Sequence, residues 1–132
     1  MRYLLDTHAL VWALDDPARL PPAVGALLRD PSNYPLGVAA ITPWEIALLA
    51  ARGRLRLSRP VADWINEALR PGFAELLPLI PPIAVDSCAL PGAFHADPAD
   101  RMIVATARHH SLTLLTADDA IRAYPHLHTQ WN

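Results

Sequence analysis

Four acidic residues, far apart in the chain, stand at or just after positions where a helix is expected to begin. They are Asp6, Glu45, Asp100 and Asp118. Carboxylate oxygens favour Mg²⁺ or Mn²⁺ over zinc, and such ions keep several of their waters. A cation held in this way lowers the pKa of a bound water and stabilises an in-line displacement at phosphorus. If the four acids meet, metal-assisted hydrolysis of a phosphodiester is the chemistry that they predict.

Each acid also has a plainer explanation as a helix cap. Thr42 and Glu45 have the spacing of a capping box, in which the threonine bonds the first turn and the glutamate reaches back. Pro43 and Pro98 suit the first position of a helix. An acid in the first turn also complements the helix dipole. Taken one at a time, the acids are better explained as caps than as catalysts.

Short apolar runs alternate with helical patterns along the chain. Strands are expected at 3–5, 36–40, 74–79 and 112–115, with an edge strand at 127–130, and helices at 7–14, 22–29, 43–52, 60–69, 83–90, 98–110 and 117–123. This alternation predicts an α/β fold with three α/β/α layers and a mainly parallel sheet of four to five strands. A length of 132 residues fits a single domain spanning 1–132.

That topology changes the interpretation of the acids. Helices that follow parallel strands begin at the carboxyl edge of the sheet, where open α/β sheets bind their ligands. The helix from Pro98 runs antiparallel to the strand after it, so its start returns to the same edge. At about 4 Å, two like charges repel by roughly 4 kcal/mol at an effective dielectric near 20. A cluster of four acids therefore favours a shared cation, or raised pKa values, over capping alone.

Composition narrows the class of protein. A hydrophobic fraction of 52% and a charged fraction of 18% fit a globular chain. The single cysteine, Cys88, excludes an internal disulfide and is expected to be a packed thiol. Neither a signal peptide nor an apolar run of about 18 residues is recognisable, so a soluble cytoplasmic protein without a membrane span is expected.

The charged residues give two conflicting indications about nucleic-acid binding. A net charge of -2 is not typical of a general nucleic-acid binder. All eleven basic residues are arginines, and Arg52, Arg54, Arg56 and Arg59 fall within eight positions. Guanidinium groups bind phosphates bidentately, so this cluster either holds an RNA backbone or forms a solvated loop. Arg101, beside an acid, either pairs with the acidic cluster or contacts phosphate.

Histidine and tryptophan residues near the acids leave alternatives open. His8 and His95 each flank an acid and could contact phosphate or move a proton. Tryptophans on helices usually pack in a core or an interface, and base stacking is the alternative. Those on the expected helices are Trp12, Trp44 and Trp64.

Four segments appear in the order and spacing of PIN domains and resemble most closely the VapC-type toxins of bacterial toxin–antitoxin pairs. They are Leu4-Leu5-Asp6-Thr7-His8, Trp44-Glu45-Ile46-Ala47 with Gly53-Arg54-Leu55, His95-Ala96-Asp97-Pro98-Ala99-Asp100-Arg101-Met102-Ile103, and Leu115-Thr116-Ala117-Asp118. The resemblance covers essentially the whole chain. It implies a parallel-sheet PIN fold, an endoribonuclease that depends on Mg²⁺ or Mn²⁺, and homodimers neutralised by a cognate antitoxin. The apolar faces around Trp12 and residues 22–28 are candidates for either protein contact.

By motif position, the resemblance assigns catalytic and metal-binding roles to Asp6, Glu45, Asp100 and Asp118. It also implies supporting hydroxyls at Thr7 and Thr116 and an outer acid at Asp97. In the family's mechanism the metal activates water and no covalent intermediate forms on the protein. Two positions depart from the family pattern. Ala99 replaces a usually aromatic residue, and Leu49 replaces a lysine that often occurs in close relatives.

Other classes of protein fit the first acid less well. Haloacid-dehalogenase-like phosphatases need a second acid two positions after the first, where this chain has His8. Response-regulator receivers need a lysine, and this chain has none. The remaining alternative is a catalytically silent PIN-fold module that binds a protein or RNA partner. Such forms usually lose one or more of the acids, and here all four are present.

Overall fold

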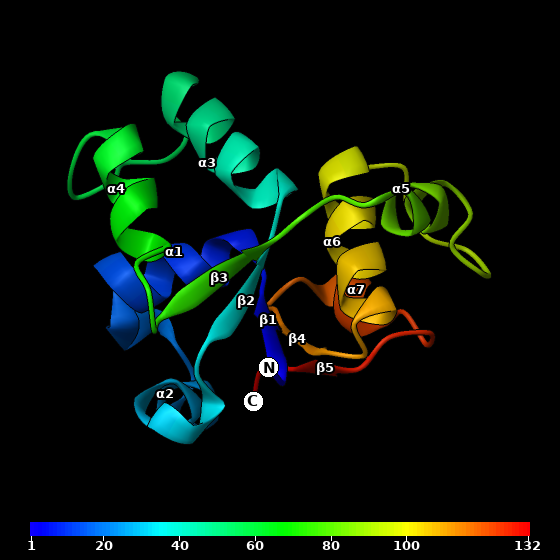
Figure 1. Ribbon diagram of the computed structural model, residues 1–132, viewed down its shortest axis with the longest axis horizontal. Helices are drawn as coiled ribbons and strands as arrows, with labels where there is room; N and C mark the ends of the chain where they lie inside the picture. Colours follow the sequence, from blue (N-terminus) through cyan, green and yellow to red (C-terminus); the bar gives the residue numbers. More distant parts are fainter.

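A five-stranded parallel sheet lies at the centre of the computed structural model, which describes residues 1–132 (Figure 1). The strands are β1 (Tyr3–Leu5), β2 (Leu36–Ala39), β3 (Ala74–Leu77), β4 (Thr113–Leu115) and β5 (Thr129–Gln130). Their order is β3-β2-β1-β4-β5, and every neighbouring pair is parallel. The predicted sheet is confirmed, and β1 occupies its middle.

Seven α-helices cover the two faces of this sheet (Figure 1). They are α1 (Thr7–Asp15), α2 (Pro22–Arg29), α3 (Ile41–Ala51), α4 (Val61–Ala68), α5 (Pro81–Cys88), α6 (Pro98–His109) and α7 (Asp119–Arg122). All seven were predicted, with boundaries that shift by a few residues. Two short 3₁₀ helices, Pro17–Arg19 and Pro31–Asn33, were not predicted.

Successive side chains of β1 enter two different cores. Tyr3 and Leu5 pack with residues of α1, α2 and α4 on one face of the sheet, whereas Leu4 packs with residues of α5, α6 and α7 on the other. Alternation of this kind follows from the two-residue period of a strand. Helices on both faces of one sheet confirm the predicted three-layer α/β/α architecture.

One expectation about packing was wrong. Cys88 is exposed at the end of α5, because the buried side of that helix carries Ile83 and Ser87. Trp44 is 55% exposed, because α3 turns Thr42 and Ile46 toward the core; of the two kinds of packing expected for it, core packing does not occur. Trp64 is buried as expected, and none of the helices has the length and hydropathy needed to cross a bilayer.

Candidate functional site

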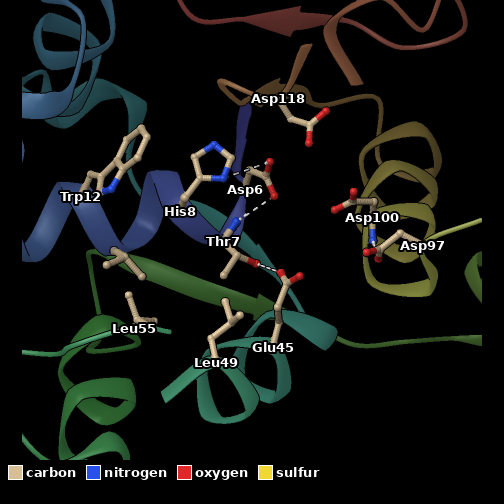
Figure 2. Close-up of a pocket in the computed structure, with 11 residues that line it drawn as sticks. Asp6, Thr7, His8, Trp12, Glu45, Leu49, Leu55, Asp97, Asp100 and Asp118 are labelled. Carbon is tan, nitrogen blue, oxygen red and sulfur yellow. Dashed lines mark hydrogen bonds and ion pairs between the residues drawn. The ribbon is translucent and has the colours of Figure 1, made fainter. Parts of the chain in front are cut away.

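Five carboxylates from four separate segments surround one pocket at the carboxyl edge of the sheet (Figure 2). Asp6 follows β1, Asp118 follows β4, and Glu45 lies on α3 after β2. The start of α6 brings Asp97 and Asp100 to the same pocket. Its volume is about 290 Å³, and it is lined by Asp6, Thr7, His8, Val11, Trp12, Glu45, Leu49, Leu55, Asp97, Asp100 and Asp118. The structure thus brings together all four sequence-predicted acids.

Asp6 is held rigidly in the middle of the sheet. Its backbone N–H donates to the Leu115 carbonyl of β4 (3.1 Å), which extends the ladder by one residue. The Oδ1 atom accepts from the Thr7 N–H (2.8 Å) and caps α1. The Oδ2 atom accepts from the Thr116 hydroxyl (2.6 Å). The residue is 3% exposed, so these bonds compensate part of the desolvation of its carboxylate.

Thr116 connects Asp6 to Asp118. Its fully buried hydroxyl donates to Asp6 and accepts from the Asp118 N–H (3.1 Å). Asp118 in turn caps α7, because its Oδ1 atom accepts from the Ile121 N–H (3.0 Å). A single hydroxyl therefore links two acids that come from neighbouring strands.

Glu45 bonds across the pocket instead of capping its own helix. The Thr7 hydroxyl donates to Glu45 Oε1. The same Thr7 hydroxyl lies 3.4 Å from the buried Thr42 hydroxyl. The helix begins at Ile41 and has no side-chain cap, so both the predicted capping box and a first-position Pro43 were wrong. Thr42 belongs instead to the polar support of the site.

Asp97 and Asp100 occupy the first turn of α6. Asp97 accepts from the Asp100 N–H (3.1 Å) as the helix cap, and Pro98 takes the first position as predicted. Asp100 Oδ2 lies 3.3 Å from His95 Nε2, with 19% of its side chain exposed. Of the two, Asp100 is the one sheltered from solvent.

Crowding of the carboxylates shows in their pKa values. Burial raises the pKa of Asp100 to about 7, and repulsion from Asp97, Asp6, Asp118 and Glu45 adds to this effect. Burial also raises the pKa of Glu45, repulsion from Asp6 and Asp97 contributes, and the bond from Thr7 opposes the shift. Asp100 and Glu45 therefore resist ionisation, because both are partly buried beside other carboxylates.

Oxygen donors alone suit a hard divalent cation such as Mg²⁺ or Mn²⁺. No three histidine, cysteine or carboxylate side chains are arranged closely enough to form a metal cage by themselves. The acids lie around the rim, an arrangement that fits Mg²⁺ because this ion usually takes one or two carboxylates, retained waters and substrate phosphates. The donor set is therefore compatible with a hydrated cation.

The five arginines singled out from the sequence divide into two groups. Arg101 donates to the backbone carbonyls of Ser87, Phe94 and His95 at 2.7–3.1 Å, so it holds the loop before α6. It forms no ion pair with Asp100, contrary to one of the two expectations for it. In contrast, the loop after α3 exposes four arginines that form no salt bridge: Arg52, Arg54, Arg56 and Arg59.

A sequence profile described as the PIN domain matches residues 3–127. The chain belongs to the PIN-domain family. This PIN domain is 36% identical over 123 residues to Ribonuclease VapC22 of Mycobacterium tuberculosis, with 93% of this chain and 92% of the relative covered. The predicted resemblance to VapC-type proteins is confirmed.

Solved structures agree with this assignment. VapBC2 from Rickettsia felis, bound to a DNA fragment from its promoter, superposes with a TM-score of 0.72 at 17% identity and covers 100% of both chains. FitAcB from Neisseria gonorrhoeae superposes with a TM-score of 0.62 at 28% identity and covers 98% of this PIN domain and 96% of that chain. The first likeness shows the fold alone, because its identity is low.

Sequence reasoning missed part of the pocket. Val11 lies four residues after Thr7, so it shares a helix face with a predicted site residue, and helical spacing could have identified it. Leu49, singled out from the sequence only as a departure from the family pattern, lies four residues after Glu45 and also lines the pocket. Leu49 supplies an apolar side chain where close relatives often have lysine, and buried Ala99 leaves no aromatic group at its position.

Proposed function

We propose that this PIN domain is an endoribonuclease that depends on Mg²⁺ or Mn²⁺ and acts as the toxin of a type II toxin–antitoxin system. The observation that carries the proposal is the convergence of five carboxylates on one pocket, with a raised pKa at Asp100 and Glu45. Helix capping alone does not account for this arrangement, because the mutual repulsion of the carboxylates is destabilising.

In the proposed site a hydrated cation would be held, directly or through its retained waters, by Asp6, Glu45, Asp100 and Asp118, with Asp97 as an outer acid. When bound, the cation lowers the pKa of a bound water and stabilises the developing charge at phosphorus. The protein orients the ligands: Thr116 aligns Asp6, and Thr7 aligns Glu45. Asp100 gives up its proton as the cation binds, since its pKa of about 7 leaves it part-protonated at neutral pH.

RNA is the proposed substrate, by analogy with the VapC relative. The arginine loop, residues 52–59, adjoins the pocket through Leu55, which lines it. We infer that Arg52, Arg54 and Arg56 bind the RNA backbone, because they are exposed and unpaired. Arg101 is not part of this proposal, because its guanidinium is occupied by backbone carbonyls.

Replacing Arg54 and Arg56 with glutamine should raise the KM for RNA and leave kcat unchanged. An unchanged KM would remove the loop from the substrate site.

Purified protein should cleave RNA with Mn²⁺ or Mg²⁺ and stop when EDTA is added. Because water is the proposed nucleophile, the products should contain no 2′,3′-cyclic phosphate. The chemistry of the product ends distinguishes cleavage by the protein from cleavage by a contaminating metal-independent ribonuclease. Full cleavage in EDTA would refute the metal mechanism, and no cleavage with either metal would favour the catalytically silent module.

The proposal includes a cognate antitoxin and a second copy of this chain as protein partners. The apolar wall of the pocket, formed by Val11, Trp12, Leu49 and Leu55, offers a surface for an antitoxin. Expression of the chain alone should then arrest growth, and a co-expressed antitoxin should relieve the arrest.

A homodimer is supported by α3, which is apolar on most sides although only Thr42 and Ile46 are buried. Sedimentation equilibrium should show a dimer that Trp44→Glu weakens, and a monomeric wild type would contradict this.

A further inference from the structure

His8 packs against two tryptophans beside the acidic pocket. Its ring centroid lies 5.0 Å from that of Trp12 and 6.1 Å from that of Trp131, and the two indoles are 5.8 Å apart. We call these three residues the aromatic trio. Trp131 is 8% exposed and belongs to the core, so it gives the imidazole a fixed wall. Figure 2 shows His8 between Trp12 and Asp6.

Both nitrogens of His8 face parts of the acidic site. Nε2 accepts a hydrogen bond from the Ala117 N–H (3.2 Å), and Nδ1 lies 3.7 Å from Asp6 Oδ2. Because Nε2 is an acceptor, a neutral ring carries its proton on Nδ1. That N–H is directed toward the Asp6 carboxylate. His8 therefore touches an acid after β1 and the backbone after β4 at the same time.

The turn after β4 is held from three directions. The Thr116 N–H donates to the Gln130 carbonyl of β5 (3.3 Å), and the Thr116 hydroxyl donates to Asp6. The third tie is the bond from Ala117 to His8. Ala117 immediately precedes Asp118, so this bond sets where the Asp118 side chain leaves the backbone. Of the three ties, only the one to His8 comes from a side chain that packs against Trp12 and Trp131.

We propose that His8 is a positioning residue that fixes Asp118 relative to Asp6, with the two tryptophans setting the plane of its ring. This inference rests on the proposed function, since the value of a fixed separation lies in metal binding. It goes beyond phosphate contact or proton transfer by His8, because Nε2 is bonded to the Ala117 N–H and Nδ1 faces Asp6. Groups that orient metal ligands typically contribute about 10- to 100-fold to metal affinity or activity.

Two substitutions separate the hydrogen bond from the ring. His8→Phe keeps an aromatic ring between the tryptophans and removes the acceptor for Ala117. His8→Gln keeps an acceptor at nearly the position of Nε2 and removes the ring. Three readouts apply to the full chain: hydrogen exchange of the Ala117 amide by NMR, Mn²⁺ affinity by calorimetry, and kcat and KM for RNA cleavage.

We expect His8→Phe to melt near the wild-type temperature yet to exchange the Ala117 amide at least about tenfold faster. Its Kd for Mn²⁺ should rise by about 10- to 100-fold and its kcat should fall by a similar factor, with KM unchanged. His8→Gln should restore slow exchange and most of the Mn²⁺ affinity. A purely structural role would lower stability without this pattern of loss and rescue.

Two outcomes separate this inference from the proposed function. If the wild type binds Mn²⁺ and His8→Phe binds it equally well, the positioning role is wrong and the nuclease stands. If His8→Gln loses as much affinity as His8→Phe, ring packing and not the hydrogen bond matters, and the positioning role is again wrong. If the wild type binds no Mn²⁺, the proposed function itself fails.

Discussion

Asp6→Asn should lower kcat for RNA cleavage by about 1,000-fold while the protein melts within a few degrees of the wild type. Asp6 is the central acid, because it is held by both Thr7 and Thr116 and repels Glu45 and Asp100. Loss of a metal ligand removes several kcal/mol of transition-state stabilisation, and about 4 kcal/mol corresponds to about 1,000-fold. Asparagine keeps an oxygen for the Thr7 N–H, so the cap of α1 survives.

Asp63→Asn is the matched control, since Asp63 is an exposed acid in the first turn of α4 and lies outside the pocket. It changes the net charge by the same amount and should leave kcat and KM unaltered. Steady-state cleavage of a labelled RNA at saturating Mn²⁺ gives both constants. An Asp6→Asn protein that is folded and cleaves at the wild-type rate would remove Asp6 from the site.

Asp100→Asn should raise the melting temperature of the metal-free protein at pH 8. The folded-state pKa of Asp100 is about 7, against an ordinary value of 3.8. Between these two values the folded protein binds more protons than the unfolded chain. The stabilisation from the protonated carboxyl is therefore fully present at low pH and is lost as the pH rises through about 7. Part of the side chain reaches solvent, which screens the effect to about 1–2 kcal/mol, or several degrees.

Thermal melts in EDTA between pH 5 and pH 8 test this expectation. The wild type should lose stability as the pH rises, and Asp100→Asn should show a flatter profile. Added Mg²⁺ should stabilise the wild type more at pH 8 than at pH 5.5, because the cation competes with the proton. Asp63→Asn should follow the wild type throughout. Parallel pH profiles for the wild type and Asp100→Asn would show that Asp100 does not hold the proton.

Much of the fold could be predicted because the chain is consistent at several levels. The apolar run before Asp6 has no polar interruption, as expected for a central strand covered on both faces, and β1 is buried throughout. The parallel topology then placed the ends of β1 and β4 and the start of α6 at one edge. That topology alone predicts that the acids converge.

Tertiary contacts explain what the sequence could not predict. Thr42 and Glu45 have capping-box spacing, but the Thr7 hydroxyl competes for the glutamate and α3 begins earlier. Arg101 looks like a phosphate ligand until the carbonyls of the preceding loop are placed around it. The contact of Trp131 with His8 joins residues at opposite ends of the chain, and local patterns carry no signal for such a pair.

Mn²⁺ binding to five versions of the protein, followed by calorimetry near neutral pH, most directly tests whether Asp6, Glu45 and Asp118 act as one group. The versions are wild type, Asp6→Asn, Glu45→Gln, Asp118→Asn and the control Asp63→Asn. We expect each change in the pocket to raise the Kd by at least about tenfold and the control to match the wild type. Equal affinity in all five proteins, or no binding by the wild type, would show that these carboxylates share a pocket without sharing a cation.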